Sequence, residues 1–148
     1  MKTLRKLFPL LPLLIAGPAC AATVASPPTI SACWIRALPD EGAAYFTISN
    51  DGDKPAVLTG IDVQGYGMSM LHQSMVMNGK SMMMAADNVS VPAQGSLSFT
   101  PGGYHGMLMN AAQPPAPGTQ LALKLKFKGG ATATASCKVK GPDATGPD

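Results

Sequence analysis

The chain has 148 residues, 46% of them hydrophobic and 13% charged, with a formal net charge of +3 at neutral pH. Three of the eleven Lys and Arg residues lie within the first six positions, so the rest of the chain carries eight cations against eight Asp and Glu residues. That balance leaves no basic stripe to indicate nucleic-acid binding, and the length suits one domain with a single core.

The start of the chain has the pattern of a secretory signal peptide. Lys2, Arg5 and Lys6 precede a short apolar run, and Ala19-Cys20-Ala21 supplies small residues for cleavage. We therefore expect a signal peptide at 1–21 and a mature protein in the periplasm. The apolar run is too short to span a membrane and no later stretch is long enough, so no membrane span is expected.

Three cysteines bear on location and stability. Cys20 lies in a poor context for lipid attachment, because the residues before it lack the usual aliphatic side chain. Cys33 and Cys137 lie near opposite ends of the mature chain, and an oxidising compartment favours a disulfide between them. The alternative is two small buried core residues that never meet, because a sequence carries no geometry.

Short strands separated by Gly, Pro, Asn and Asp turns are expected through most of the mature chain, and no stretch predicts a capped helix. The candidate strands are 30–36, 44–49, 56–63, 89–91, 96–100 and 121–127. In the last of these, leucines and Phe127 alternate with Ala122 and lysines, which is a period of two with one buried face. We predict an all-β domain over 22–140, a β-sandwich or small barrel, followed by a disordered tail at 141–148.

A β-hairpin is predicted around Asn78-Gly79, because both central residues of a type I′ turn need positive φ. The residues opposed across a two-residue turn are Met77 and Lys80, Ser74 and Met83, and His72 and Ala85. His72 and Met83 then share a face as diagonal neighbours, close enough for long side chains to meet at a metal. The methionines expected on the opposite face are Met75, Met77, Met82 and Met84.

Methionine is concentrated in one window of the sequence. All ten methionines except Met1 lie between Met68 and Met109, and both histidines lie in the same window. Thioether sulfur is a soft ligand that suits Cu(I), and imidazole is a good copper ligand. The candidate metal ligands are His72, Met83, His105 and Met107. The alternative, methionine as a flexible core filler, does not explain why the rest of the mature chain has none.

These residues resemble the periplasmic copper(I) chaperones of the PCuAC family. The family signature is His, ten residues, Met, twenty-one residues, His, one residue and Met, and the four candidate ligands keep that spacing. Other segments that fit the family are 34–37, 44–50, 91–93 and 101–109. The resemblance implies a cupredoxin-like Greek-key β-sandwich that binds one Cu(I) ion.

The same resemblance implies delivery of copper to the copper centres of cytochrome c oxidase, with an oxidase subunit or another copper chaperone as partner. A periplasmic storage or resistance protein without an oxidase acceptor is the main alternative, because its ligands would be the same. One departure from the family is Met70, where an acidic residue is common two positions before the first histidine. A thioether there could serve as a spare ligand.

Three other classes of protein are less consistent with the sequence. A blue-copper electron carrier needs a cysteine thiolate beside two histidines, and neither Cys33 nor Cys137 lies near the candidate ligands. An enzyme is not expected, because the mature chain has no local His-carboxylate-Ser arrangement. An interaction domain without metal is the remaining alternative, and a failure to bind copper would favour it.

Overall fold

The structure, a computed structural model, describes residues 26–147, so the signal peptide predicted at 1–21 lies outside the described residues. This part of the chain contains ten strands and no helix, and hence no helix that could cross a membrane. The strands are β1 (Thr29–Ala37), β2 (Glu41–Asn50), β3 (Ala56–Val63), β4 (Tyr66–Met77), β5 (Lys80–Ala85), β6 (Val89–Val91), β7 (Gly95–Phe99), β8 (Tyr104–Ala111), β9 (Gln120–Phe127) and β10 (Thr132–Lys140).

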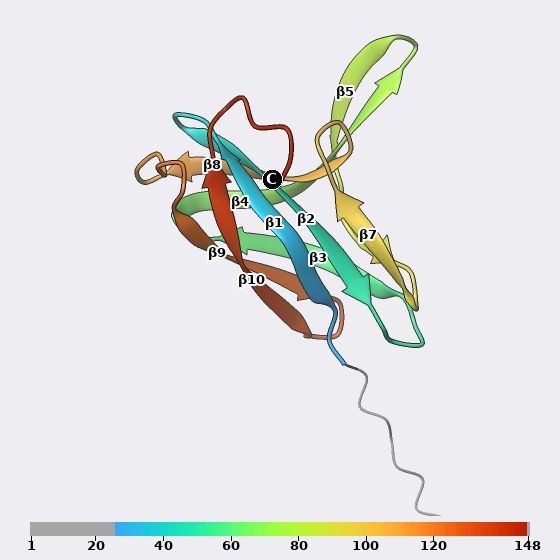
Figure 1. Cartoon of the computed structure of the whole chain (residues 1–148). Coiled ribbons are helices and arrows are strands. Elements are labelled where there is room, and N and C mark those ends of the chain that lie inside the picture. Colours follow the sequence, from blue (N-terminus) through green and yellow to red (C-terminus); the bar gives the residue numbers. More distant parts are fainter. Residues whose placement is uncertain (1–25, 148) are drawn as a thin grey trace, which may run out of the picture.

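All ten strands belong to one sheet that curls over to form two layers (Figure 1). The order along the sheet is β5-β4-β8-β2-β1-β10-β9-β3-β6, and β7 pairs with the second half of β2. Consecutive strands β3 and β4 lie far apart in this order, so the chain crosses between layers as it does in Greek-key sandwiches. The predicted all-β sandwich is confirmed.

The core of the described residues is apolar and contains no methionine. Its largest fully buried side chains include Phe46, Phe99, Ile35, Ile48, Leu58, Leu108, Leu123 and Leu125. Phe46 and Phe99 are opposed on β2 and β7, and their stacked rings have centroids 4.4 Å apart. Burial of each such side chain stabilises the fold by about 1.5–3 kcal/mol. The methionines between Met68 and Met109 are all at least partly exposed.

The six candidate strands overlap β1, β2, β3, β6, β7 and β9. In β9 the predicted alternation is confirmed, because Leu123, Leu125 and Phe127 are buried while Lys124 and Lys126 are exposed. After β10 the chain forms no further strand up to residue 147, and the Ala144 N–H donates to the Gly141 carbonyl at 3.2 Å. Disorder of the tail remains a prediction.

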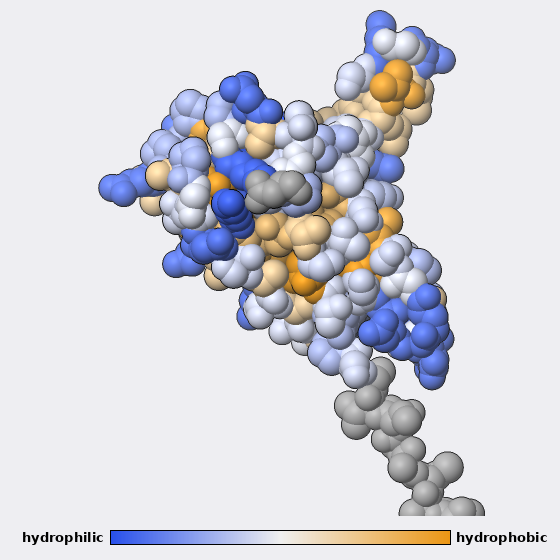
Figure 2. Space-filling model, viewed as in Figure 1, coloured by the Kyte–Doolittle hydropathy of each residue, from blue (hydrophilic) through white to orange (hydrophobic). Residues whose placement is uncertain are grey.

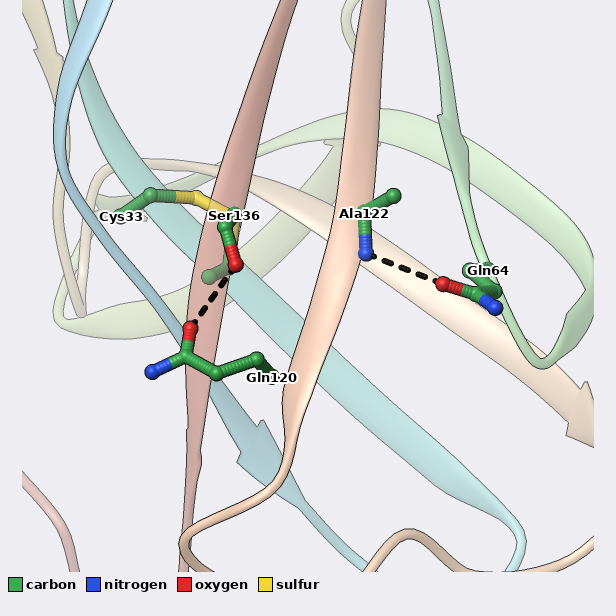
Figure 3. Close-up of a disulfide and its surroundings, with 6 residues drawn as sticks. Cys33, Gln64, Gln120, Ala122 and Ser136 are labelled. Carbon is green, nitrogen blue, oxygen red and sulfur yellow. Dashed lines mark hydrogen bonds between the residues drawn. A yellow bond between two sulfur atoms is a disulfide. The ribbon is translucent and has the colours of Figure 1, made fainter.

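A disulfide joins Cys33 of β1 to Cys137 of β10, the pairing that the oxidising compartment favoured (Figure 3). Their Cα atoms are 4.7 Å apart although 104 positions separate them in the sequence. β1 bulges at this point, where its register with β2 shifts between Ser31 and Trp34 and Ala32 has a φ of 49°. Beyond the bulge β1 runs parallel to β10, so the disulfide covalently fixes the start of that pair.

Candidate metal centre

Both histidines lie on the outer face of the β4–β8 pair. The antiparallel register places His72 of β4 directly opposite His105 of β8. The centroids of the two imidazole rings are 6.0 Å apart and the ring planes are close to perpendicular, at 80°. Leu71 and Leu108 on the inner face of the same strands are buried in the core. Two nitrogen donors from neighbouring strands therefore lie side by side on the surface of the sheet.

Met107 shares this outer face, because it follows His105 by two residues on β8. It lies opposite Met70 of β4, and the next pair along is Met68 with Met109. Met107 is therefore the diagonal neighbour of His72, about 7–8 Å away, a distance from which its long side chain can reach an ion bound between the histidines. Met70 lies two residues from His72 on β4, as Met107 lies two residues from His105 on β8. The register of these strands thus gives the residue at position 70 a place beside the candidate ligands.

The β4–β5 hairpin has the predicted register. The opposed residues are Met77 and Lys80, Ser74 and Met83, and His72 and Ala85. The turn residues Asn78 and Gly79 have the positive φ values, 51° and 73°, that a type I′ turn requires. Met83 therefore shares the face of His72 as its diagonal neighbour.

Met83 differs from the other three candidate ligands in its surroundings. The pairing of β4 with β8 ends at Gln73, and the hairpin beyond this residue projects from the body of the sheet (Figure 1). The side chain of Met83 is 55% exposed, whereas His105 is buried. The structure therefore brings His72, His105 and Met107 together on two adjoining strands and places Met83 on the exposed edge strand beside them.

Gly106 separates the two candidate ligands of β8 and allows close packing of the layers. A Cβ atom at this position would lie 2.6 Å from Ile61 Cδ1 of β3 and 3.2 Å from the Cβ atom of Ala44. Both contacts are shorter than ordinary van der Waals separation. β8 can therefore lie against the opposite layer while it presents His105 and Met107 outward, because the residue between them has no side chain.

A backbone carbonyl orients His105. Its Nδ1 atom lies 3.1 Å from the Gly103 carbonyl oxygen, which also accepts the Ser74 N–H at 3.0 Å. Because a carbonyl oxygen can only accept, Nδ1 carries the ring proton in this contact and the Nε2 lone pair is left for a metal. Sequence analysis did not identify Gly103, although it lies only two residues before His105, because the contact depends on local backbone and ring conformation that the residue pattern does not specify.

The surroundings of His72 favour its neutral form. Its Nδ1 atom is buried and has no hydrogen-bond partner among the described residues. Burial, followed by the charge that His105 can carry, lowers the pKa of His72 below its usual value. A cavity of about 190 Å³ borders the ring and is also lined by Met70, Ala85 and Asp87. The neutral form, which is the form that binds metal, therefore persists further into acid than in a free histidine.

The donor set favours a soft ion. Within residues 26–147 no group of three or more His, Cys, Asp or Glu side chains is placed to hold a metal. Mg²⁺ and Ca²⁺ prefer oxygen ligands, and protein zinc sites are built from Cys, His and carboxylates. Two imidazoles beside methionine thioethers form instead the kind of site that suits Cu(I).

Comparison with known proteins places the chain in a sequence family. The model of the LpqE-like family, described as "Putative lipoprotein LpqE-like", matches residues 28–139. The protein named "Putative lipoprotein Lxx21020" from Leifsonia xyli subsp. xyli (strain CTCB07) is 30% identical over 113 residues, which cover 75% of this chain and 68% of that protein.

Solved structures share the fold. The apo PmoF2 PCuAC domain has a TM-score of 0.67 at 21% identity, over 83% of this chain and 97% of that domain. The solution structure of CuI-DR1885 from Deinococcus radiodurans has a TM-score of 0.64 at 28% identity, over 84% of this chain and 85% of that protein. The predicted cupredoxin-like β fold is confirmed by these matches.

Proposed function

The chain belongs to the LpqE-like family, a relative of the PCuAC domains whose fold it shares, and from this premise we propose that it is a Cu(I)-binding chaperone acting outside the cytoplasm. The copper ion is its cargo, to be bound and then passed on. The proposed ligands are His72, Met83, His105 and Met107. The family and fold point to a copper chaperone rather than to an enzyme.

One observation carries this proposal. His72 and His105 are directly opposed on the outer face of the sheet, with Met107 on the same face beside them. The Gly103 carbonyl holds the His105 ring with Nε2 free, and burial lowers the pKa of His72, which favours its neutral form. Two imidazoles held side by side on one face of the sheet need little rearrangement before they bind an ion.

Met83 suits the release of the ion. It reaches the site from the exposed β5 strand, and its flexible side chain can turn away without breaking a backbone hydrogen bond of the sheet. A donor atom of an acceptor protein can then replace the Met83 sulfur while both histidines still hold the copper. The exposed ligand is therefore the expected point of exchange.

The relatives support the same cargo. CuI-DR1885, which is 28% identical to this chain, is a Cu(I) form of a protein with this fold. The "lipoprotein" names of the family and of the Leifsonia protein agree with a location at the cell envelope, and the signal peptide predicted at 1–21 gives a route there. We infer a periplasmic location from these observations.

We further propose that the acceptor is a copper centre of cytochrome c oxidase, reached directly or through another copper chaperone. The alternative is copper storage or resistance, in which the ion is kept rather than transferred. The exposed position of Met83 favours transfer, because a storage site gains from enclosing its ion.

An anaerobic Cu(I) titration of the mature chain tests the site. We expect one tightly bound equivalent, with X-ray absorption showing both nitrogen and sulfur neighbours around the copper. The variant His72→Ala, His105→Ala should lose this equivalent, while Met75→Leu, on the other face of the hairpin, should keep it. A copper environment of nitrogen and oxygen alone would contradict the proposed ligands.

Transfer is tested separately. The Cu(I)-loaded chain is mixed with an apo CuA domain of an oxidase subunit, and copper in each protein is measured after separation. A chaperone should pass its ion to the acceptor, and Met83→Leu should alter the rate of transfer. If the loaded chain keeps its copper under conditions in which the acceptor binds free Cu(I), the storage alternative is supported.

A further inference from the structure

The projecting β4–β5 hairpin carries a second group of methionines, on the face turned away from His72. At its centre Met75 of β4 lies directly opposite Met82 of β5. Met77 follows Met75 by two residues on β4, and Met84 follows Met82 by two residues on β5, so both lie on the same face as this pair. We call this group, Met75, Met77, Met82 and Met84, the back face of the hairpin.

Packing does not account for the back face. Met77, Met82 and Met84 are 51%, 44% and 49% exposed, and the described core contains no methionine. β5 is the edge strand of the sheet, so no further strand covers it in the described part of the chain. In Figure 2 apolar residues extend along the projecting hairpin behind a hydrophilic tip. An edge strand of this kind ordinarily carries charged residues that limit aggregation, so the apolar thioethers call for another explanation.

The hairpin places four thioethers within reach of one ion. The Cβ atoms of an opposed pair such as Met75 and Met82 are about 4.5–5.5 Å apart, and diagonal neighbours about 7–8 Å. Methionine has three rotatable side-chain bonds, so the sulfur atoms can converge from these positions. Lys80 is the single titratable residue between Gln73 and Met84, so this stretch has no carboxylate and no imidazole that would attract a harder ion.

We propose that the back face is a second metal site, built of thioethers alone and selective for a soft monovalent ion, Cu(I) or its analogue Ag(I). It is separate from the histidine site, because alternate residues of a strand point to opposite faces of the sheet. It is the weaker of the two, since it has no imidazole donor and Lys80 lies at its tip. Met83 lies between Met82 and Met84 on β5, so the two sites are connected through one strand.

A nuclear magnetic resonance titration with Ag(I) tests the proposal, using the full mature chain with ¹³C-labelled methionine methyl groups. Ag(I) is the probe because it does not change oxidation state during the titration. The first equivalent should shift the methyl signals of Met83 and Met107. The second should shift those of Met75, Met77, Met82 and Met84. A second equivalent that leaves all four back-face signals in place would overturn the proposal.

Matched variants separate the two sites. The double variant Met75→Leu, Met82→Leu keeps the apolar volume and removes the central pair of sulfur atoms. Affinity for the second equivalent should therefore fall by about tenfold or more, because loss of a ligand costs at least as much as loss of a residue that only orients one. The first equivalent should be unchanged. Met83→Leu should have the reverse effect.

The outcomes distinguish this proposal from the proposed function. If the wild-type chain shows the back-face signals shifting but no binding at Met83 and Met107, the histidine site is contradicted and the back-face site is still supported. A normal first equivalent with no saturable second one would overturn the back-face site. Equal weakening of the second equivalent by Met75→Leu, Met82→Leu and by Met83→Leu would also overturn it, since a single diffuse methionine surface would then bind both ions. Thermal unfolding of each apo variant checks that the hairpin is intact.

Discussion

Two parts of the same sheet, the pair of strands β1 and β10 and the three strands β4, β5 and β8, differ in what their side chains do. The first is held by the Cys33–Cys137 disulfide and by buried side chains such as Trp34, Ile35 and Val139, and it contains none of the candidate ligands. The second contains both histidines and every methionine of the described residues, and its outermost strand is exposed along its whole length. Stability and metal affinity should therefore respond to different substitutions.

Removal of the disulfide should have the largest effect on stability. The variant Cys33→Ala, Cys137→Ala opens a loop of 104 residues, for which chain entropy predicts a loss of at most ~4–5 kcal/mol. The free energy of unfolding from urea titration measures the loss, with the wild-type chain as control. The folded fraction of the variant should still bind Cu(I) at one equivalent. Loss of binding by a fully folded variant would show that the two regions are not independent.

Gly106→Ala should test how the ligand-bearing strand β8 packs against the opposite layer. The new Cβ atom would lie 2.6 Å from Ile61 Cδ1, so the layers must separate or Ile61 must move, at a cost of about 1–3 kcal/mol. Copper affinity should fall as well, because displacement of β8 moves His105 and Met107. The control must be a glycine whose φ suits other residues, which excludes Gly102 with its φ of +86°. Gly60→Ala on β3 is the matched control, because the added Cβ atom would lie 3.6 Å from its nearest neighbour, Lys126 Cδ, which is an ordinary van der Waals distance.

Substitution of the two thioether ligands should affect affinity more than stability. Met83→Leu and Met107→Leu keep most of the side-chain volume, so the free energy of unfolding should change by less than ~1.5 kcal/mol. Cu(I) affinity should drop by about tenfold or more for each, since loss of a ligand costs at least as much as loss of its orienting partner. Competition with a Cu(I) chelator measures the affinity. Unchanged affinity for Met107→Leu would favour Met70, its opposed neighbour, as the ligand.

Acid should weaken copper binding through the histidines. Protons compete with Cu(I) for imidazole nitrogen, so affinity falls as pH drops, by up to about tenfold per pH unit for each titrating ligand. Because burial lowers the pKa of His72, its contribution should be lost only below the usual value of about 6.5. Affinity measured from pH 7.5 to 5 tests this, and a flat profile would exclude the histidines as ligands.

The free energy of unfolding of the apo protein should also depend on pH through His72. The pKa of His72 is lower in the folded state than in the unfolded state, so the unfolded chain takes up a proton first as pH falls. Its contribution to stability is therefore complete above the unfolded pKa and decreases as pH falls through the lowered folded pKa. Unfolding measured with and without His72→Ala isolates this contribution.

The smallest effect on copper affinity is expected from substitutions on the back face of the hairpin. Met75→Leu and Met82→Leu should leave the affinity for the first copper equivalent nearly unchanged, because strand alternation turns both side chains away from His72. A chelator competition at one equivalent of Cu(I) measures this. If both weaken the first equivalent as much as Met83→Leu does, the copper site is a diffuse methionine surface rather than a four-residue site.

The sequence by itself determined the local features of this protein. Asn78-Gly79 set the register of the hairpin, because positive φ at both turn positions leaves few other ways to close it, and the register placed Met83 diagonal to His72. Alternation in β9 revealed its buried face for a similar reason: the period of a strand is a property of neighbouring residues. The spacing of the four candidate ligands likewise needed no coordinates.

Only the tertiary structure decided which distant residues meet. The pairing of β4 with β8 puts His72 opposite His105 and Met70 opposite Met107, and it brings the Ser74 N–H to the Gly103 carbonyl. No local pattern encodes these contacts, because the register between strands far apart in sequence depends on how both pack on the common core. The unequal exposure of the ligands has the same origin: β8 is covered on both edges by neighbouring strands, whereas β5 has a neighbour on one edge only.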